Sequence, residues 1–194
     1  MMRISLVLAT LGLAACTQTP GTPPAQGVAY LPPPQFEFGV PLTSDPVLTS
    51  VMSASSYLAD PPSRLAGNPA LAAQVAAQYE YATVALREPR FIGYSPLMQL
   101  RMDSGRLALR ESLGIAPDAP PDLVVGQLTR LAGALGRGDT AGAEAAASGP
   151  LFVKPAPVVL ATFSAMPRVP AASIAASFAE QQLNGPDASI YKVR

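Results

Sequence analysis

Three dipeptides constrain the fold of this chain most, because each places a capping side chain directly before a proline. They are Asp45-Pro46, Asn68-Pro69 and Ser95-Pro96. A proline at the first helical position loses no intrahelical hydrogen bond, and the preceding Asp, Asn or Ser can accept one from an amide of the first turn. The dipeptides therefore predict helices that begin near residues 46, 69 and 96, and they make helix the default structure for the chain.

Apolar residues recur at steps of three and four in three segments, as they do on one face of a helix. The segment 69–88 is expected to bury one stripe, and 120–136 repeats that pattern. In 96–113 the apolar residues fall on two nearly opposite faces, so we expect this helix to lie between neighbours. The positions are Leu71, Val75, Tyr79, Ala82 and Leu86, then Val124, Leu128, Leu131 and Leu135, and in the middle helix Met98, Met102, Leu109 and Leu113 with Leu97, Leu100 and Leu107 opposite.

Four further segments complete the predicted secondary structure. Residues 45–59 and 170–183 carry helical patterns, and 139–148 is almost entirely Ala, Gly and Glu. The segment 151–166 suits a buried strand or a short helix after Pro157, and helix is favoured. The sequence thus predicts an all-α fold, a small helical bundle of about five to seven helices after a proline-rich tether.

The first sixteen residues are typical of a bacterial export signal. Arg3 supplies a positive charge, the apolar run 4–13 is too short to span a bilayer, and small residues precede Cys16. The tetrapeptide Leu13-Ala14-Ala15-Cys16 resembles the lipobox of bacterial lipoproteins. This resemblance covers only the leader, and the alternatives are an ordinary cleaved signal or a buried N-terminal helix.

The resemblance implies cleavage between Ala15 and Cys16, with diacylglycerol on the cysteine sulfur and an acyl chain on its amine. Two or three acyl chains hold a protein in a bilayer where a single one is marginal. Lipoproteins kept in the inner membrane often carry Asp after the cysteine, whereas this chain has Thr17 and Gln18. The expected location is therefore the outer membrane, facing the periplasm.

Composition excludes much catalytic chemistry. The chain has one cysteine, no histidine and no tryptophan. Lipidation of that cysteine leaves no thiol for a disulfide, a metal or catalysis, and the missing histidine removes the commonest general base and metal ligand. The formal net charge is zero, so no attraction to nucleic acid is implied. We expect no cofactor beyond the lipid and no metal.

Domain boundaries follow from a change in composition near residue 43. The leader 1–15 is expected to be removed, and 16–43, which is rich in Pro, Gly, Thr and Gln, reads as a tether in extended polyproline II geometry. Because it carries aromatic residues, either its end docks on the domain, which is favoured, or its Pro-rich stretch binds a partner. The remaining residues, 44–194, form the helical domain. The aromatic residues are Tyr30, Phe36 and Phe38.

Arginines and aromatic residues concentrate between residues 79 and 111, which makes this segment the best candidate for a contact surface. Asp103, Arg106 and Arg110 share one helix flank, where an intrahelical charge ladder is favoured over an anion-binding site. Apolar residues in the loop before residue 96 either plug the bundle end, which is favoured, or contact a partner or ligand. The candidate contact residues are Arg90, Phe91, Tyr94 and Tyr81.

Two functions remain open from the sequence. The preferred one is a non-enzymatic, membrane-anchored lipoprotein whose helical domain binds another envelope protein or component. The alternative is a domain that binds a small ligand or lipid in a pocket between helices, with arginines at its mouth. An enzyme of the glycosidase or transglycosylase kind, which needs only carboxylates, is a distant third. The expected pocket lining is Tyr79, Tyr81, Phe91, Tyr94 and Met98.

Overall fold

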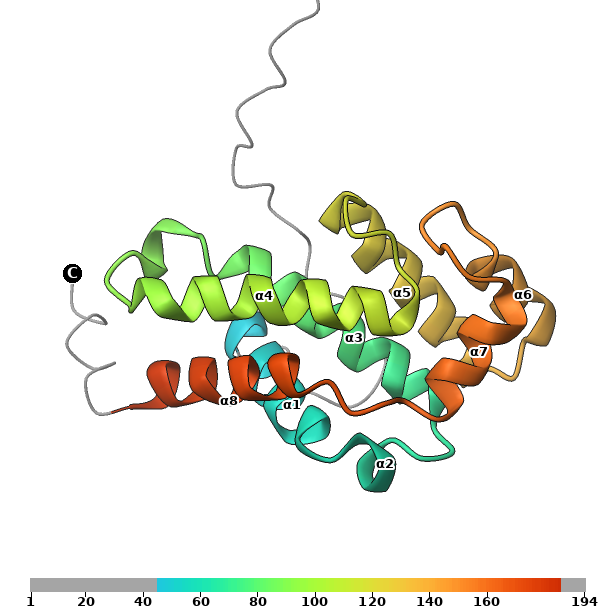
Figure 1. The fold of residues 1–194 in the computed structure, drawn as a ribbon, viewed down its shortest axis with the longest axis horizontal. Helices are drawn as coiled ribbons and strands as arrows, with labels where there is room; N and C mark the ends of the chain where they lie inside the picture. Colours follow the sequence, from blue (N-terminus) through green and yellow to red (C-terminus); the bar gives the residue numbers. More distant parts are fainter. Residues whose placement is uncertain (1–44, 186–194) are drawn as a thin grey trace, which may run out of the picture.

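The computed structural model describes residues 45–185, and every regular element in this range is a helix (Figure 1). Seven substantial α-helices occur in the described range together with a four-residue helix, which confirms the predicted all-α class. The predicted leader 1–15, cleavage site Ala15, lipid site Cys16 and tether 16–43 lie outside the described residues. The elements are α1 Pro46–Ala59, α2 Pro61–Arg64, α3 Pro69–Ala85, the 3₁₀ helix η1 Pro89–Phe91, α4 Pro96–Leu113, α5 Pro121–Gly136, α6 Thr140–Ala147, α7 Ala156–Ser164 and α8 Pro170–Asn184.

The three predicted helix starts at residues 46, 69 and 96 are confirmed, although one cap differs from expectation. The Asp45 carboxylate accepts a hydrogen bond from the Val47 amide at 2.9 Å, and the Asn68 side chain accepts one from the amide three residues later at 3.0 Å. The Ser95 side chain caps nothing; its backbone carbonyl accepts from the Met98 amide instead. The proline after Ser95, with its fixed φ, is sufficient to start α4 there.

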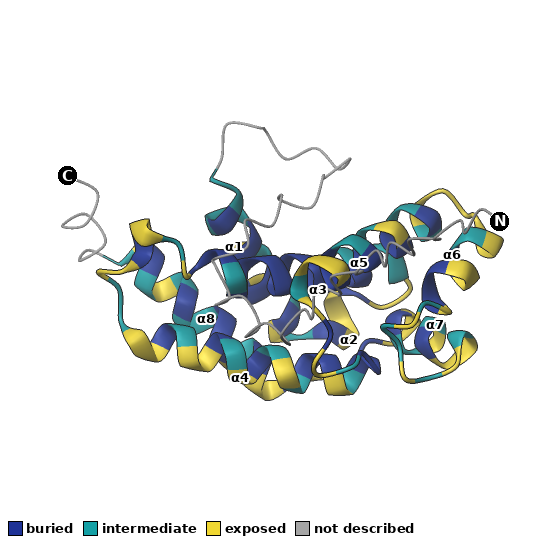
Figure 2. Cartoon of the chain, turned by 90° about the horizontal axis from the view of Figure 1, so that it is seen from above, coloured by how far each residue is buried: buried dark blue, intermediate teal, exposed yellow. Residues whose placement is uncertain are grey.

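Helix α3 is the central element of the fold and packs against α1, α4, α5 and α7. Figure 2 shows it as an almost continuously buried helix between its neighbours. The expectation that residues 69–88 bury a single stripe is therefore wrong. Helix α3 is rich in alanine, and alanine allows neighbouring helices to approach closely from any side. Alanine hardly contributes to the periodicity of large apolar residues. The periodicity of α3 therefore predicted fewer buried residues than the structure has.

Helix α4 lies at the surface, so the expectation that both its apolar faces contact neighbours is also wrong. Met98 and Met102 are fully buried, but Leu97, Leu100 and Leu107 on the other face are 44%, 66% and 48% exposed. Figure 2 shows this exposed side along the whole length of the helix. The alanine-rich α3 lies at the centre of the fold instead. Its small side chains allow more helices to pack around it than the larger side chains of α4 would.

Helix α8 returns along the molecule and packs against both α1 and α4, which are far from it in sequence (Figure 1). It approaches α4 closely at Gly105, where an added Cβ would lie 2.9 Å from the Ala172 Cα. Only a residue without a side chain permits this crossing. The helices nearest the two ends of the described range thus close the fold by packing side by side.

Strand and helix were both possible for the segment 151–166. The structure confirms the favoured helix, which is α7. One isolated antiparallel bridge joins Phe152 to Ile115, just after α4. The Val153 amide donates to the Gly114 carbonyl at 2.8 Å. This short pairing leads the chain back from α6 to α7, which packs on α3.

Candidate functional site

A buried ion pair between α3 and α4 lies at the centre of the charged segment 79–111. Glu80 and Arg110 are 4% and 3% exposed, and the Arg110 Nε donates to the Glu80 Oε2 at 3.1 Å while a second guanidinium nitrogen contacts Oε1. The third guanidinium nitrogen donates at 2.8 Å to each of the backbone carbonyls of Pro117 and Ala119. Arg110 therefore ties α3 to α4 and to the segment that precedes α5.

The neighbouring charges neutralise one another around this pair. Arg106 contacts Asp103 at 3.3 Å and Glu80 at 3.5 Å, and Arg87 of the α3–η1 connection donates to Asp103 at 2.6 Å. The predicted ladder is thus correct for Asp103 with Arg106. It is wrong for Arg110, because the carboxylate of Glu80 on α3 offers a shielded partner that the spacing along one helix cannot reveal.

Three of the four predicted contact residues come together where η1 joins α4. Phe91 is 7% exposed, its ring centre lies 5.9 Å from that of Tyr94, and the Arg90 guanidinium lies over it at 4.5 Å. The fourth residue, Tyr81, is 1% exposed within α3. The burial of Phe91 fits a ring that plugs this end of the bundle, while the neighbouring Ile92 is exposed.

Arg90 fastens the start of α1 to the η1 segment. It pairs with Asp45 at 2.5 Å and with Glu88 at 2.8 Å. Burial alone would lower the pKa of Arg90, but the hydrogen bonds to these two carboxylates raise it above its ordinary value. Asp45 thus serves twice, since its carboxylate also caps α1.

The side chains expected to line a ligand pocket are mostly part of the core. Tyr79, Tyr81 and Met98 are at most 1% exposed, and the Tyr79 hydroxyl donates to the Met102 carbonyl at 3.2 Å. Burial raises the pKa of Tyr79 above its ordinary value, and the nearby carboxylates of Asp103 and Glu80 raise it further. The phenol therefore stays neutral and serves as a buried hydrogen-bond donor.

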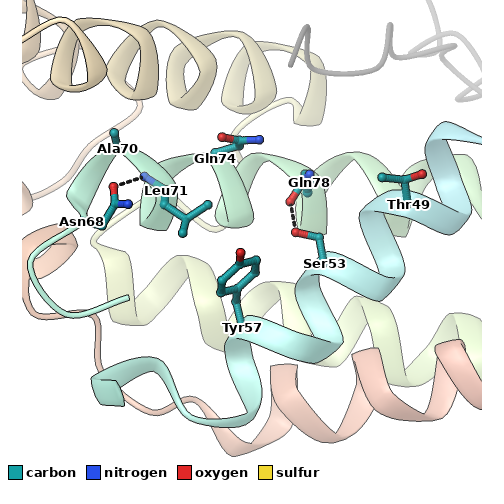
Figure 3. A pocket seen from close by; sticks show the side chains of 8 residues that line it. All are labelled: Thr49, Ser53, Tyr57, Asn68, Ala70, Leu71, Gln74 and Gln78. Carbon is teal, nitrogen blue, oxygen red and sulfur yellow. Dashed lines mark hydrogen bonds between the residues drawn. The ribbon is translucent and has the colours of Figure 1, made fainter. Parts of the chain in front are cut away.

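A hollow that the sequence did not indicate lies between α1 and α3 (Figure 3). Its volume is about 310 Å³, and no charged side chain lines it. Thr49, Ser53 and Tyr57 of α1 lie four residues apart, and so do Gln74 and Gln78 of α3, which is about one helical turn. That spacing is visible in the sequence, but a polar stripe ordinarily indicates a solvent-facing surface. The lining residues are Thr49, Ser53, Tyr57, Asn68, Ala70, Leu71, Gln74 and Gln78.

The polar groups of this hollow fall into two sets. The Ser53 hydroxyl donates to the buried Gln78 amide oxygen at 2.5 Å, so this pair holds α1 against α3. Within residues 45–185, the side chains of Thr49, Tyr57 and Gln74 make no hydrogen bond. Figure 3 shows the Tyr57 ring standing between the two helices, with its hydroxyl toward the α3 side.

Two other kinds of site are absent from the part of the chain that the structure describes. No three Asp, Glu, His or Cys side chains in 45–185 are grouped so that they could hold a metal ion. No helix in the same range is long and apolar enough to cross a bilayer.

Comparison of the chain with protein-family models, with curated proteins and with solved structures found no match in any of the three.

Proposed function

We propose that this chain is a lipid-anchored protein of the bacterial cell envelope whose helical domain binds another envelope component without catalysing a reaction. The lipobox-like sequence that ends at Cys16 is the observation that carries the anchoring. The proposed location is the outer membrane, on its periplasmic face. The segment 16–43 would then act as the tether between the anchor and the domain.

The side-chain chemistry of the described domain favours binding over catalysis. Catalytic carboxylates are usually held in a cleft with a perturbed pKa. Here Glu80 and Asp103 form ion pairs with arginines where α3 and α4 meet. Asp45 forms an ion pair with Arg90 and caps α1. The hollow between α1 and α3 instead presents neutral hydrogen-bonding groups. This hollow also favours the alternative, a domain that binds a small ligand.

Substitution of Cys16 tests the anchor directly. Cys16→Ala removes the only thiol in the chain, so labelling with a radioactive fatty acid should be lost and the protein should leave the membrane fraction or remain unprocessed. The wild-type chain, fractionated in parallel, is the reference. An unchanged mass and an unchanged membrane fraction in the variant would contradict the lipid anchor.

Crosslinking in living cells tests the binding role. A photo-crosslinking amino acid placed at exposed positions of the domain, such as Ile92 or Leu100, should capture a defined envelope component from the wild-type chain. The same positions in the Cys16→Ala chain serve as the control for mislocalised contacts. Recovery of no envelope component above this control would contradict the proposed function.

A further inference from the structure

We propose that the hollow between α1 and α3 is a binding site for an uncharged carbohydrate, such as a short stretch of a neutral glycan. The hollow is lined by two hydroxyl-bearing aliphatic side chains, one tyrosine and three amide side chains. This inference rests on the proposed binding role, and it names the chemical class that the domain would bind.

The neutral lining excludes ionic ligands as the natural occupants. A charged group that enters a partly enclosed site loses hydration, and this loss is repaid only by an opposite charge or by several hydrogen bonds aimed at it. None of the eight residues that line the hollow is charged. A phosphate, a carboxylate or an ammonium group would thus be poorly compensated there.

The hydrogen-bonding groups match those of a sugar. A hydroxyl both donates and accepts, and a carboxamide presents a donor and an acceptor side by side, which suits the neighbouring hydroxyls of a sugar ring. Thr49, Tyr57 and Gln74, whose side chains make no hydrogen bond to another described residue, line one hollow from two helices. The Ser53–Gln78 hydrogen bond behind them fixes the spacing of α1 and α3, so these groups are held in place before a ligand arrives.

The shape of the hollow agrees with this assignment. Tyr57 stands between the helices and offers an aromatic ring to the apolar face of a sugar (Figure 3). The volume of about 310 Å³ is near the lower end of the usual range for small-molecule sites, roughly 300 to 1,000 Å³. A helical peptide in a groove would need several large apolar anchor pockets. Here Leu71 is the one large aliphatic side chain of the lining.

Titration of the detergent-purified full chain with neutral saccharides tests the site. The probes are maltose, lactose and the β1,4-linked dimer of N-acetylglucosamine, followed by nuclear magnetic resonance or calorimetry. At least one probe should bind, and Gln74→Leu should weaken its binding by about tenfold, since a half-buried hydrogen-bonding partner of the sugar is lost. Tyr57→Phe should weaken binding less than Tyr57→Ala, because it keeps the ring.

The exposed Gln181 of α8 provides a matched control, since Gln181→Leu makes the same chemical change outside the hollow. Its affinity should equal that of the wild type, and all variants should keep the wild-type circular dichroism spectrum at the temperature of the titration. The site is overturned if no probe binds at millimolar concentration, or if Gln74→Leu and Tyr57→Ala leave the affinity unchanged. Preferential binding of a peptide in the hollow overturns it as well.

The failure of this site is distinguishable from failure of the proposed function. If the Gln74→Leu chain still crosslinks an envelope component in cells while no saccharide binds, the carbohydrate site is wrong and the binding role stands. If saccharides bind but no envelope component is captured, the site is correct and the envelope role is wrong.

Discussion

Arg110 is a charged residue that the fold buries almost completely, and its surroundings explain how that is possible. Its guanidinium group meets the carboxylate of Glu80 and two backbone carbonyls after α4. A buried ion pair of this kind rarely adds net stability over apolar residues, but the loss of one partner leaves a charge without compensation. The pair therefore acts as a positional lock between α3 and α4.

Glu80→Gln should destabilise the domain by about 3 to 5 kcal/mol, because it leaves the buried guanidinium without its counter-charge. The change keeps the side-chain volume, so loss of packing contributes little. Chemical denaturation of both chains measures the difference. Asp60→Asn is the control, since it alters a carboxylate that pairs with the 64% exposed Arg168, and it should leave the free energy of unfolding nearly unchanged. Equal effects of the two substitutions would contradict the lock.

Tyr79 makes the free energy of unfolding depend on pH in alkaline solution. Its pKa is raised in the folded chain by burial first and by nearby carboxylates second. The unfolded chain loses the phenol proton near pH 10, about where an unperturbed tyrosine titrates. The stability contributed by the neutral phenol is thus complete below about pH 10, and it is lost as pH rises toward the folded pKa.

Denaturant titrations between about pH 9 and pH 12 should accordingly show a falling free energy of unfolding. In Tyr79→Phe the fall should be shallower by at most about 1.4 kcal/mol per pH unit, the limit for one titrating proton. The variant will also lose the hydrogen bond to Met102, which lowers stability at every pH. An unchanged slope would show that Tyr79 is not the titrating group.

At the scale of elements, the decisive contacts join helices that are distant in sequence. Helix α8 packs on α1 and α4, and α3 packs on α5 and α1. Small residues make these approaches possible: Gly105 faces the α8 backbone at Ala172, and alanine is the commonest residue of α3. The helices fill the core by packing close together, because the chain has few large aromatic side chains that could fill gaps between them.

Gly105→Ala tests the α4–α8 crossing. The added methyl would collide with the Tyr79 hydroxyl and the Ala172 backbone, so we expect a loss of about 1 to 3 kcal/mol despite the higher helix propensity of alanine. Gly126→Ala in α5 is the matched control, because the nearest atom to its added Cβ is the end of the Arg130 side chain, at 3.6 Å. That variant should gain up to about 1 kcal/mol. Stabilisation by both changes would refute a tight crossing at Gly105.

At the scale of the whole molecule, the described domain depends on its last helix. α8 lies along two helices that would otherwise expose their inner faces (Figure 1). The contacts include the hydrogen bond between Ser55 and Ser177 at 3.2 Å and the Arg101 guanidinium 4.4 Å from the Phe178 ring centre. The fold is therefore closed by elements from opposite ends of the described range.

A chain that ends after Met166, and so lacks α8, should not unfold cooperatively. The exposed inner faces of α1 and α4 should bind an apolar dye such as ANS, as in partly folded states that keep helices without fixed packing. Circular dichroism during heating, together with dye fluorescence, measures both properties. A sharp thermal transition equal to that of the full chain would contradict a closing role for α8.

Much of the secondary structure was determined by the sequence itself, because capping and proline effects act within a few residues. Pro46, Pro69 and Pro96 begin the helices they predict, and the favoured helix near residue 158 is α7. The charged and aromatic segment was also recognisable, since Arg90, Phe91 and Tyr94 are near one another in sequence. Interactions between residues that are close in sequence can be predicted from short sequence patterns.

The tertiary structure alone decided which helix is central, which arginine is buried and where a hollow forms. Alanine carries almost no periodic signal, so the burial of most of α3 depended on which helices packed around it. Arg110 forms an ion pair with Glu80, and Gln78 accepts a hydrogen bond from Ser53. Both contacts join helices that are separated in sequence. These pairings depend on the distances between helices in space, and no spacing along the chain records them.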